Sequence, residues 1–332
     1  MPNPVTSPKI RVAFIGAGQF ANAFHYSTLS RMEDVEMAAI AELDEERMAK
    51  TGDKYGIDAR YTDYREMIDK EQPDVVYVVM RPHLVKGIAL DVIRTGTHVA
   101  TEKPAGMNTA EVRALAEAAA EHDINSMVGT NRRYCAVIRK ARELVTERGP
   151  VSTVFAEFHK HLKQEMFGMS ILYADVLHVL DPLRFFCGEV ESVQAHADHW
   201  YTKEGWENSN NVYQALIRFQ GGASGIFSAN RQAGGRYERF EVHGDGITAV
   251  VRAPDRVEVI RSGEKEAEII TGKDLTGSDD MLDTYGYFDE NRTFMDCLRS
   301  GEHAPTHLGD NLKLMELCDR IEGGDHREML RR

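Results

Sequence analysis

The sequence predicts an α/β protein with two domains. The first has a doubly wound parallel sheet, and the second is an α+β domain with a large, mostly antiparallel open sheet. Three observations support this prediction. The chain has 332 residues, which is room for about two domains. Short apolar runs alternate with helical segments up to residue 129, and period-two strands dominate after residue 212. We therefore expect domains at residues 1–129 and 130–332.

The strands of the first domain are short apolar runs, several of them continuous, as strands covered on both faces must be. They are expected at residues 10–15, 35–41, 75–79, 98–101 and 126–128. Intervening helices are expected at residues 19–31, 45–55, 86–95 and 109–122. Asn108 can cap the last of these helices, whose alanine-rich sequence has high helix propensity.

The second domain is expected to mix helices with half-buried strands. Residues 212–219 alternate apolar and mostly polar side chains, the period of a strand with one covered face. Glycine pairs mark several of the turns. Strands are expected at residues 152–161, 212–219, 223–230, 237–243, 247–252 and 257–261, and helices from residue 134, at 171–186, at 287–299 and at 308–321.

Composition excludes several partner classes. The 53 acidic residues outnumber the 40 basic ones, which disfavours nucleic acid and anionic membranes as partners. No apolar run approaches the roughly 18 residues of a membrane span, and the start lacks signal-peptide features. The four cysteines form no CxxC pair, so we expect reduced, buried thiols. These observations predict a soluble, cytoplasmic protein.

A glycine-rich turn follows the first strand and opens a helix, the context in which GxGxxA binds a dinucleotide. Gly16 would make the tight turn, Gly18 would let a pyrophosphate approach the backbone, and Ala21 would let the helix pack on the strand. This predicts a Rossmann domain that binds NAD(P). The expected cofactor contacts of the turn are Gly16, Gly18, Gln19, Phe20 and Ala21.

An acidic residue, Glu42, ends the second strand. A carboxylate there accepts hydrogen bonds from the ribose hydroxyls and repels a 2′-phosphate, and no arginine follows the strand directly, so NAD is favoured over NADP. The alternative is that the carboxylates of this segment only complement the dipole of the next helix, which suits Glu45 and Glu46 better than Glu42.

Residues 96–104, GTHVATEKP, follow this turn and resemble the Gfo/Idh/MocA oxidoreductases, relatives of glucose-fructose oxidoreductase and inositol dehydrogenase. The resemblance continues through Asn131-Arg132-Arg133-Tyr134, the helix at 171–186 and the segment 288–321, so it covers nearly the whole chain. It implies a dehydrogenase that transfers a hydride between nicotinamide and a secondary hydroxyl of a sugar, cyclitol or related polyol.

The resemblance also implies site residues. The lysine matching Lys103 lies beside the nicotinamide and contacts the substrate hydroxyl, and Glu102 and Asn131 are expected near the cofactor. Pro104 favours an extended backbone at Lys103, which would project its side chain from the strand end. The family uses the histidine matching His178 as general base, and an imidazole titrates near pH 6.5, in the range this role needs.

The helix at 171–186 is apolar nearly all round, so its polar stripe of Asp175, His178 and Asp181 needs partners or a wet cavity. Family members often carry DxGxHxxD, whereas here Ala174 and Val176 occupy the first acid and the glycine positions. Asp175, one residue later, lies on nearly the same helical face as His178 and is expected to assist it. A proline at 182 is expected to kink or break the helix.

Weaker candidates complete the predicted site. The loop Arg81-Pro82-His83 also departs from the family pattern but is expected to touch the cofactor. His159 and His161 lack a third ligand within reach by sequence, so no metal is expected. Substrate contacts are expected from Arg133, His159, Lys160, Tyr173, Asp181, Asn230 and Arg231.

Two other functions remain open at this point. Relatives of the family use NAD transiently to eliminate a glycosidic bond without net redox change, and net NADH production would separate them from a dehydrogenase. A non-enzymatic nucleotide-binding regulator would keep the glycine turn but lose the base, whereas His178 and Lys103 are both present.

The open sheet of the second domain is also expected to dock on a copy of itself, which predicts a homodimer or homotetramer.

Overall fold

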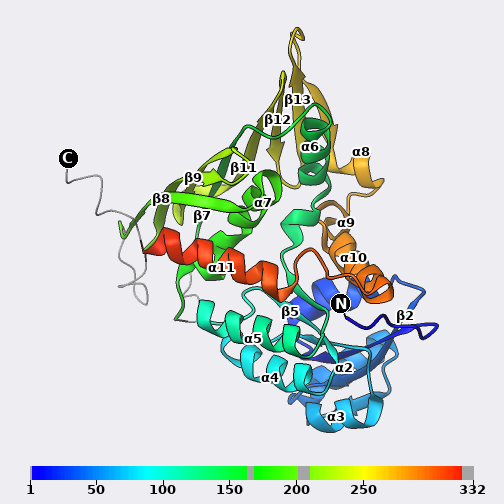
Figure 1. Cartoon of the computed structure of the whole chain (residues 1–332). Helices are drawn as coiled ribbons and strands as arrows, with labels where there is room; N and C mark the ends of the chain where they lie inside the picture. Colours follow the sequence, from blue (N-terminus) through cyan, green and yellow to red (C-terminus); the bar gives the residue numbers. More distant parts are fainter. Residues whose placement is uncertain (1, 163–167, 201–209, 324–332) are drawn as a thin grey trace. The chain divides into compact units, whose positions relative to one another are not determined.

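The computed structural model describes residues 2–162, 168–200 and 210–323 (Figure 1). These residues form two compact units, the first within 1–130 and 287–313 and the second within 131–286 and 314–332. No helix in the described ranges is long and apolar enough to cross a membrane.

The first unit is built on a six-stranded parallel sheet with the order β3-β2-β1-β4-β5-β6. This order reverses direction at β1 and β4, which confirms the doubly wound sheet. The strands are β1 (Ile10–Ile15), β2 (Val35–Ala41), β3 (Ala59–Tyr61), β4 (Val75–Val78), β5 (His98–Glu102) and β6 (Ser126–Gly129). The helices are the π-helix η1 (Ala21–Tyr26), α1 (Ser27–Leu29), α2 (Glu45–Tyr55), α3 (Tyr64–Glu71), α4 (Pro82–Arg94), α5 (Thr109–Glu121) and α10 (Tyr287–Ser300).

Side-chain caps start the helices of this unit where the sequence places them. Asp44 accepts the backbone N–H of Arg47 at α2, and Asn108 accepts that of Glu111 at α5, both at 3.0 Å. Helix α4 begins at Pro82, four residues before the expected start, because proline fits the first helical position. The short β3 and the polar α3 were not predicted, since neither carries a long apolar pattern.

The first unit extends beyond the expected boundary at residues 129 and 130, because it also contains residues 287–313. Phe294, Met295 and Leu298 of α10 are buried in the same core as Phe14 and Tyr77. The apolar face of α10 therefore packs in the core of the first unit. The position of α10 late in the sequence does not indicate this packing.

The second unit contains an eight-stranded sheet with the order β14-β13-β12-β11-β7-β10-β9-β8. Only the β7–β10 pair is parallel, which confirms the mostly antiparallel sheet. The strands are β7 (Thr153–His161), β8 (Val190–Asp198), β9 (Val212–Phe219), β10 (Ser224–Asn230), β11 (Gln232–Gly244), β12 (Ile247–Arg252), β13 (Arg256–Arg261) and β14 (Glu268–Thr271). Strands β8 and β14 were not predicted.

The helices outside the sheet are the 3₁₀-helix η2 (Asn131–Tyr134), α6 (Ala136–Thr146), the π-helix η3 (Leu172–Val176), α7 (Leu177–Cys187), α8 (Gly272–Thr276), α9 (Met281–Thr284) and α11 (Leu308–Glu322). The expected break at Pro182 is wrong, because α7 continues through this residue to Cys187. The irregularity lies one turn earlier, in the π-helical turn η3, where a wider helix accommodates an extra residue per turn.

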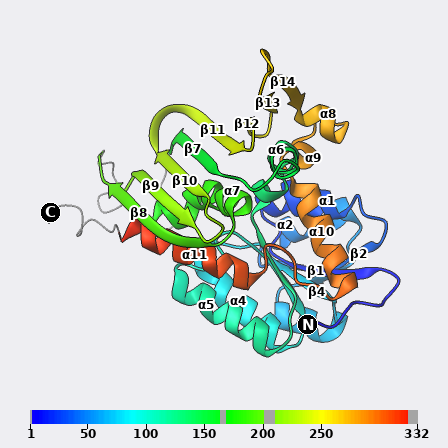
Figure 2. The same cartoon turned by 45° about the horizontal axis from the view of Figure 1, so that its top comes forward.

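The sheet of the second unit has two different faces (Figure 2). Helix α7 packs on one face, called the inner face below, against β7 and β10. Val154, Ala156 and Phe158 of β7 point to this face and are buried, whereas Phe155 points to the opposite, outer face and is 38% exposed. The alternation follows from the two-residue period of a strand.

The placement of α10 can be tested by a core truncation. We expect Phe294→Ala to lower the free energy of unfolding of the first unit by about 3–5 kcal/mol, because a fully buried ring is lost. Urea denaturation would measure the change. Leu43→Ala, which truncates a side chain that is 79% exposed, is the control and should cost less than about 0.5 kcal/mol. An equal, small effect of both variants would contradict the assigned core.

Candidate functional site

The glycine turn of the first unit leaves its backbone open to a ligand. Gly16 has φ +105°, and a Cβ there would lie 2.4 Å from the carbonyl oxygen of Val79, so only glycine permits this approach to the end of β4. A Cβ at Gly18 would meet nothing within 4 Å. The space beside Gly18 is therefore free, and the helical segment that starts there directs its N-terminus toward it. This geometry fits the pyrophosphate of a dinucleotide.

Glu42 lies at the carboxyl end of β2 and is tied to the same turn. Its Oε2 accepts the backbone N–H of Ala17 at 2.9 Å, and its Oε1 accepts that of Asp44 at 3.1 Å. The guanidinium of Arg47 approaches Oε2 at 3.4 Å and also pairs with Asp44. An arginine thus does reach Glu42, from the first turn of α2, and it pairs there with two carboxylates.

Glu102 anchors the segment that carries Lys103. Its Oε1 bonds to Nε2 of His25 at 2.8 Å, and its Oε2 accepts the backbone N–H of Lys103 at 3.1 Å. His25 lies on the π-helix η1, is 1% exposed, and contacts Asn291 through Nδ1. No periodic pattern marks His25 as a site residue, because a histidine inside an amphipathic helix is indistinguishable from a packed core residue. Lys103 follows β5 and is half-buried.

The other cofactor candidates of this unit lie on loop and helix starts. Gln19 and Phe20 are exposed at the start of the helical segment, where the Phe20 ring contacts Phe24 with a centroid distance of 4.5 Å. Arg81 precedes α4 and is exposed, as is His83 in the first turn of that helix. All of them follow the carboxyl ends of β1 or β4, where ligands of doubly wound sheets bind.

In the second unit, Asp175 is the buried centre of an ion-pair group. Its Oδ1 lies 2.5 Å from Nζ of Lys160, and its Oδ2 lies 2.7 Å from Nε of Arg231. The carboxylate thus gains the partners that its place in an apolar helix demands. Lys160 belongs to β7 and Arg231 follows β10, so two neighbouring strands supply the cations. Three predicted residues, Asp175, Lys160 and Arg231, are brought together.

Two further predicted residues pair with each other. Nε of Arg133, in η2, lies 3.1 Å from Oδ2 of Asp181 on α7, and both side chains are buried. Asn131 uses its side chain within the same unit, because Nδ2 donates to the carbonyl of Tyr285 at 2.8 Å and Oδ1 accepts from Arg132. A Cβ at Gly286 would lie 2.6 Å from the carbonyl oxygen of Asn131, so this glycine allows η2 to pack closely.

His178 lies on α7 between Asp175 and Asp181 and is 7% exposed. Tyr173, in η3, donates its hydroxyl to Asp319 of α11. By contrast, His159 and Asn230 are register partners that point to the outer face of the sheet, where His159 stacks on Tyr237 with a centroid distance of 6.2 Å. These two predicted substrate contacts are therefore on the opposite side of the sheet from Lys160.

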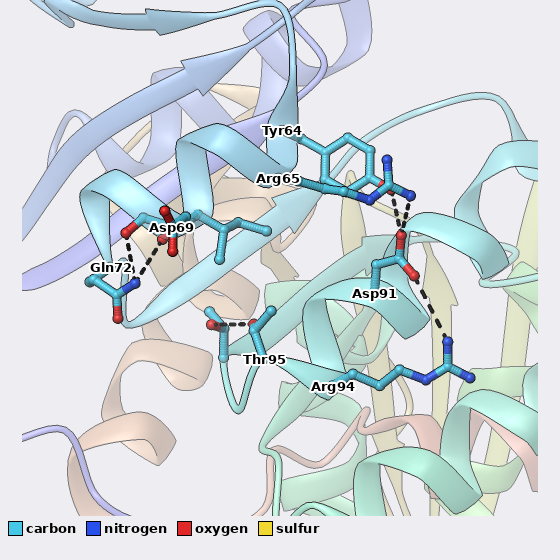
Figure 3. A pocket seen from close by; sticks show the side chains of 9 residues that line it. Tyr64, Arg65, Asp69, Gln72, Asp91, Arg94 and Thr95 are labelled. Atoms are coloured by element: carbon cyan, nitrogen blue, oxygen red, sulfur yellow. Dashed lines mark hydrogen bonds and ion pairs between the residues drawn. The ribbon is translucent and has the colours of Figure 1, made fainter.

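A separate cavity of about 450 Å³ opens beside α3 and α4 of the first unit (Figure 3). Its residues Gln72 and Thr97 precede β4 and β5, so it lies toward the amino ends of the strands, away from the glycine turn. Asp91 accepts hydrogen bonds there from Tyr64 and Arg65. The polar groups of this cavity satisfy one another, and no predicted site residue lines it.

Comparisons with known proteins agree with this division. Residues 10–130 match the family described as an oxidoreductase family with an NAD-binding Rossmann fold, and residues 138–250 match the GFO/IDH/MocA C-terminal domain. Myo-inositol 2-dehydrogenase of Thermotoga maritima is 25% identical over 320 residues, which cover 92% of each chain.

Solved structures show the same fold. A dehydrogenase from Chromobacterium violaceum superposes with a TM-score of 0.86 at 18% identity and covers 96% of this chain and 95% of its own. An oxidoreductase from Agrobacterium radiobacter, in complex with NAD+, L-tartaric acid and magnesium, has a TM-score of 0.82 at 20% identity, with 95% and 96% covered. The glycine turn, the two sheets and both domain matches together place this chain in the GFO/IDH/MocA family of oxidoreductases.

Proposed function

We propose that this protein is an NAD-dependent dehydrogenase that oxidises a secondary hydroxyl of a sugar, cyclitol or related polyol, or reduces the corresponding ketone. One observation carries the proposal: the same chain contains an open glycine turn and a helix, α7, that bears the buried His178. The relative named myo-inositol 2-dehydrogenase supports the substrate class.

The protein's own residues would supply positioning and proton transfer. NAD, when bound, supplies the hydride acceptor. His178 would take the proton of the substrate hydroxyl, because an imidazole can serve as base near neutral pH. Lys103 would donate to the same oxygen and stabilise the negative charge that develops on it. Asp175 would position this face of the helix through Lys160 and Arg231 rather than act as an independent base.

The first unit would prefer NAD to NADP. Glu42 lies at the end of β2, and its side chain is 11% exposed. There it can accept hydrogen bonds from the ribose hydroxyls. Arg47 is paired with Glu42 and Asp44, and these two carboxylates would repel a 2′-phosphate that approached it. The NAD+ complex of the structural relative from Agrobacterium radiobacter supports this choice of cofactor.

A cytoplasmic location is part of the proposal. All four cysteines are free, and Cys135, Cys297 and Cys318 are buried. Burial raises the pKa of the Cys135 and Cys187 thiols to about 12, which keeps them protonated and unreactive. A chain of this size without disulfides is typical of a reducing compartment.

The outer face of the sheet would form the contact with a second copy of the chain. Leu216, Ile226 and Tyr237 are 40–48% exposed on it, and a cavity of about 220 Å³ lies beside Phe155 and Arg239. Apolar side chains that gather on one exposed sheet face mark an interaction surface. A homodimer or homotetramer would cover this face.

The cofactor preference can be tested at Glu42. The wild type should bind NAD more tightly than NADP in isothermal titration. Glu42→Ala should weaken NAD binding about tenfold, since charge-assisted hydrogen bonds to the ribose are lost, and should narrow the gap to NADP by freeing Arg47. In the double variant Glu42→Ala/Arg47→Gln, NADP affinity should fall below that of Glu42→Ala, because the freed arginine is also removed. Equal or tighter NADP binding by the wild type would contradict the assignment.

The proposed base can be tested by kinetics. His178→Ala should lower kcat by about 10²–10⁴-fold while NAD affinity stays within a few fold, because the base acts in chemistry and not in cofactor binding. The acidic limb of the wild-type pH profile should disappear in this variant. Lys103→Ala should likewise lower kcat. Near-normal turnover of His178→Ala across pH would assign the base elsewhere.

The proposed assembly can be tested in solution. Light scattering at micromolar concentration should show a dimer or tetramer. Ile226→Glu should shift the protein toward the monomer, because it places a charge in the centre of the apolar face, whereas Met281→Glu on helix α9, outside the sheet, should not. A monomeric wild type would count against the outer face as a contact surface.

A further inference from the structure

The inner face of the second unit carries two ion-pair triads, each with one carboxylate and two cations. In the first, Asp175 pairs with Lys160 and Arg231. In the second, Glu238 pairs with Arg132 at 3.3 Å and with Arg236 at 3.0 Å. Tyr285 donates its hydroxyl to Glu238 at 2.6 Å and adds no charge. The six charged residues of the two triads, without Tyr285, are called the cation network below. They carry four positive and two negative charges.

The ring of Phe158 joins the two triads. The Arg231 guanidinium lies 4.3 Å from the ring centroid, the Lys160 ammonium 5.2 Å and the Arg236 guanidinium 5.8 Å. Three cations therefore converge on one aromatic side chain of β7, which attracts each of them by its π-face but removes none of their charge.

Arg231 makes the excess costly for the unliganded fold. Its side chain is 0% exposed, and its Nη2 has no hydrogen-bond partner among the residues that the structure describes. A buried charged donor without a partner is destabilising, so an additional acceptor carrying negative charge would offset the cost of this arrangement.

The rest of the network is reachable from solvent. The Lys160 side chain is 22% exposed and that of Arg236 is 51% exposed, whereas Asp175 and Glu238 are almost fully buried. Burial lowers the pKa of Lys160, and the nearby Arg231 and Arg236 act in the same direction, against the opposing effect of Asp175. The accessible side of the network is therefore its cationic side.

The geometry points to a polyol substrate that carries an oxyanion group, a carboxylate or a phosphate, which binds to the Lys160 and Arg236 side chains over the Phe158 ring. This inference rests on the proposed function, because it assigns the substrate class of the same unit. It separates sugar acids and sugar phosphates from the neutral sugars and cyclitols that the proposed function alone would allow.

The inference can be tested by equilibrium binding to the full chain loaded with NAD. Matched ligands in the gluco and galacto series would be compared by calorimetry: the hexose, the uronate and the hexose 6-phosphate. An anionic member should bind at least about tenfold more tightly than its neutral hexose, and its affinity should fall as salt rises. The uronate and phosphate arms identify which oxyanion is preferred. If every anionic ligand binds no better than its neutral hexose, or none binds, the inference is wrong.

Substitutions localise the effect. Arg236→Gln should weaken the anionic ligand about tenfold or more, change a neutral ligand less than twofold and leave NAD affinity unchanged. Lys160→Met should weaken the anionic ligand by a larger factor than the neutral one, because Lys160 also pairs with Asp175. Arg236 is half-exposed, so its variant should fold normally, which circular dichroism would check. The matched controls are Lys273→Met, 63% exposed, and Arg252→Gln, 49% exposed, both outside the cation network. Equal weakening of anionic and neutral ligands would show a packing role and overturn the inference.

Turnover separates this inference from the proposed function. NADH absorbance would be followed with the same ligands. Tight binding of the anionic ligands without NADH formation from any polyol would leave the cation network as their site and reject the dehydrogenase. NADH formation from neutral polyols, with no preference for anionic ones, would support the dehydrogenase and reject the inference.

Discussion

The second unit depends on how the carboxylate of Asp175 is kept charged inside an apolar helix. An unpaired buried carboxylate would cost several kcal/mol, so the fold supplies Lys160 from β7 and Arg231 from the end of β10. This pairing holds α7 against the sheet and places His178 one turn further along the helix. The same requirement brings an excess of cations to the inner face, so one electrostatic constraint stabilises the unit and defines the chemistry of its surface.

The first unit uses the backbone for the corresponding task. The turn at Gly16 requires the left-handed φ and the close approach to Val79 that only glycine permits. Glu42 then ties this turn to β2 through the N–H of Ala17, and His25 ties Glu102 to the π-helix η1. Hydrogen bonds thus tie the residues proposed to bind the dinucleotide to the strand ends of the sheet.

The sheet of the second unit serves two purposes because its side chains alternate. Lys160 points to the inner face and joins the cation network, while the adjacent His159 points outward and stacks on Tyr237. A shift of one residue in register would exchange the two faces. The parallel β7–β10 pairing fixes this register, since it sets Asn230 beside His159 on the outer face and leaves Arg231 to turn inward.

The two-domain α/β architecture, the glycine turn and most strand and helix positions could be predicted from the amino-acid sequence, because they depend on local periodicity and turn chemistry. Which of the predicted residues lie in contact depends on the tertiary fold. It assigned α10 to the first unit, carried α7 through Pro182, brought Arg47 to Glu42 and separated His159 and Asn230 from Lys160. Strand β14 and helix α3 escaped prediction because each is a short segment with too little apolar pattern to reveal it.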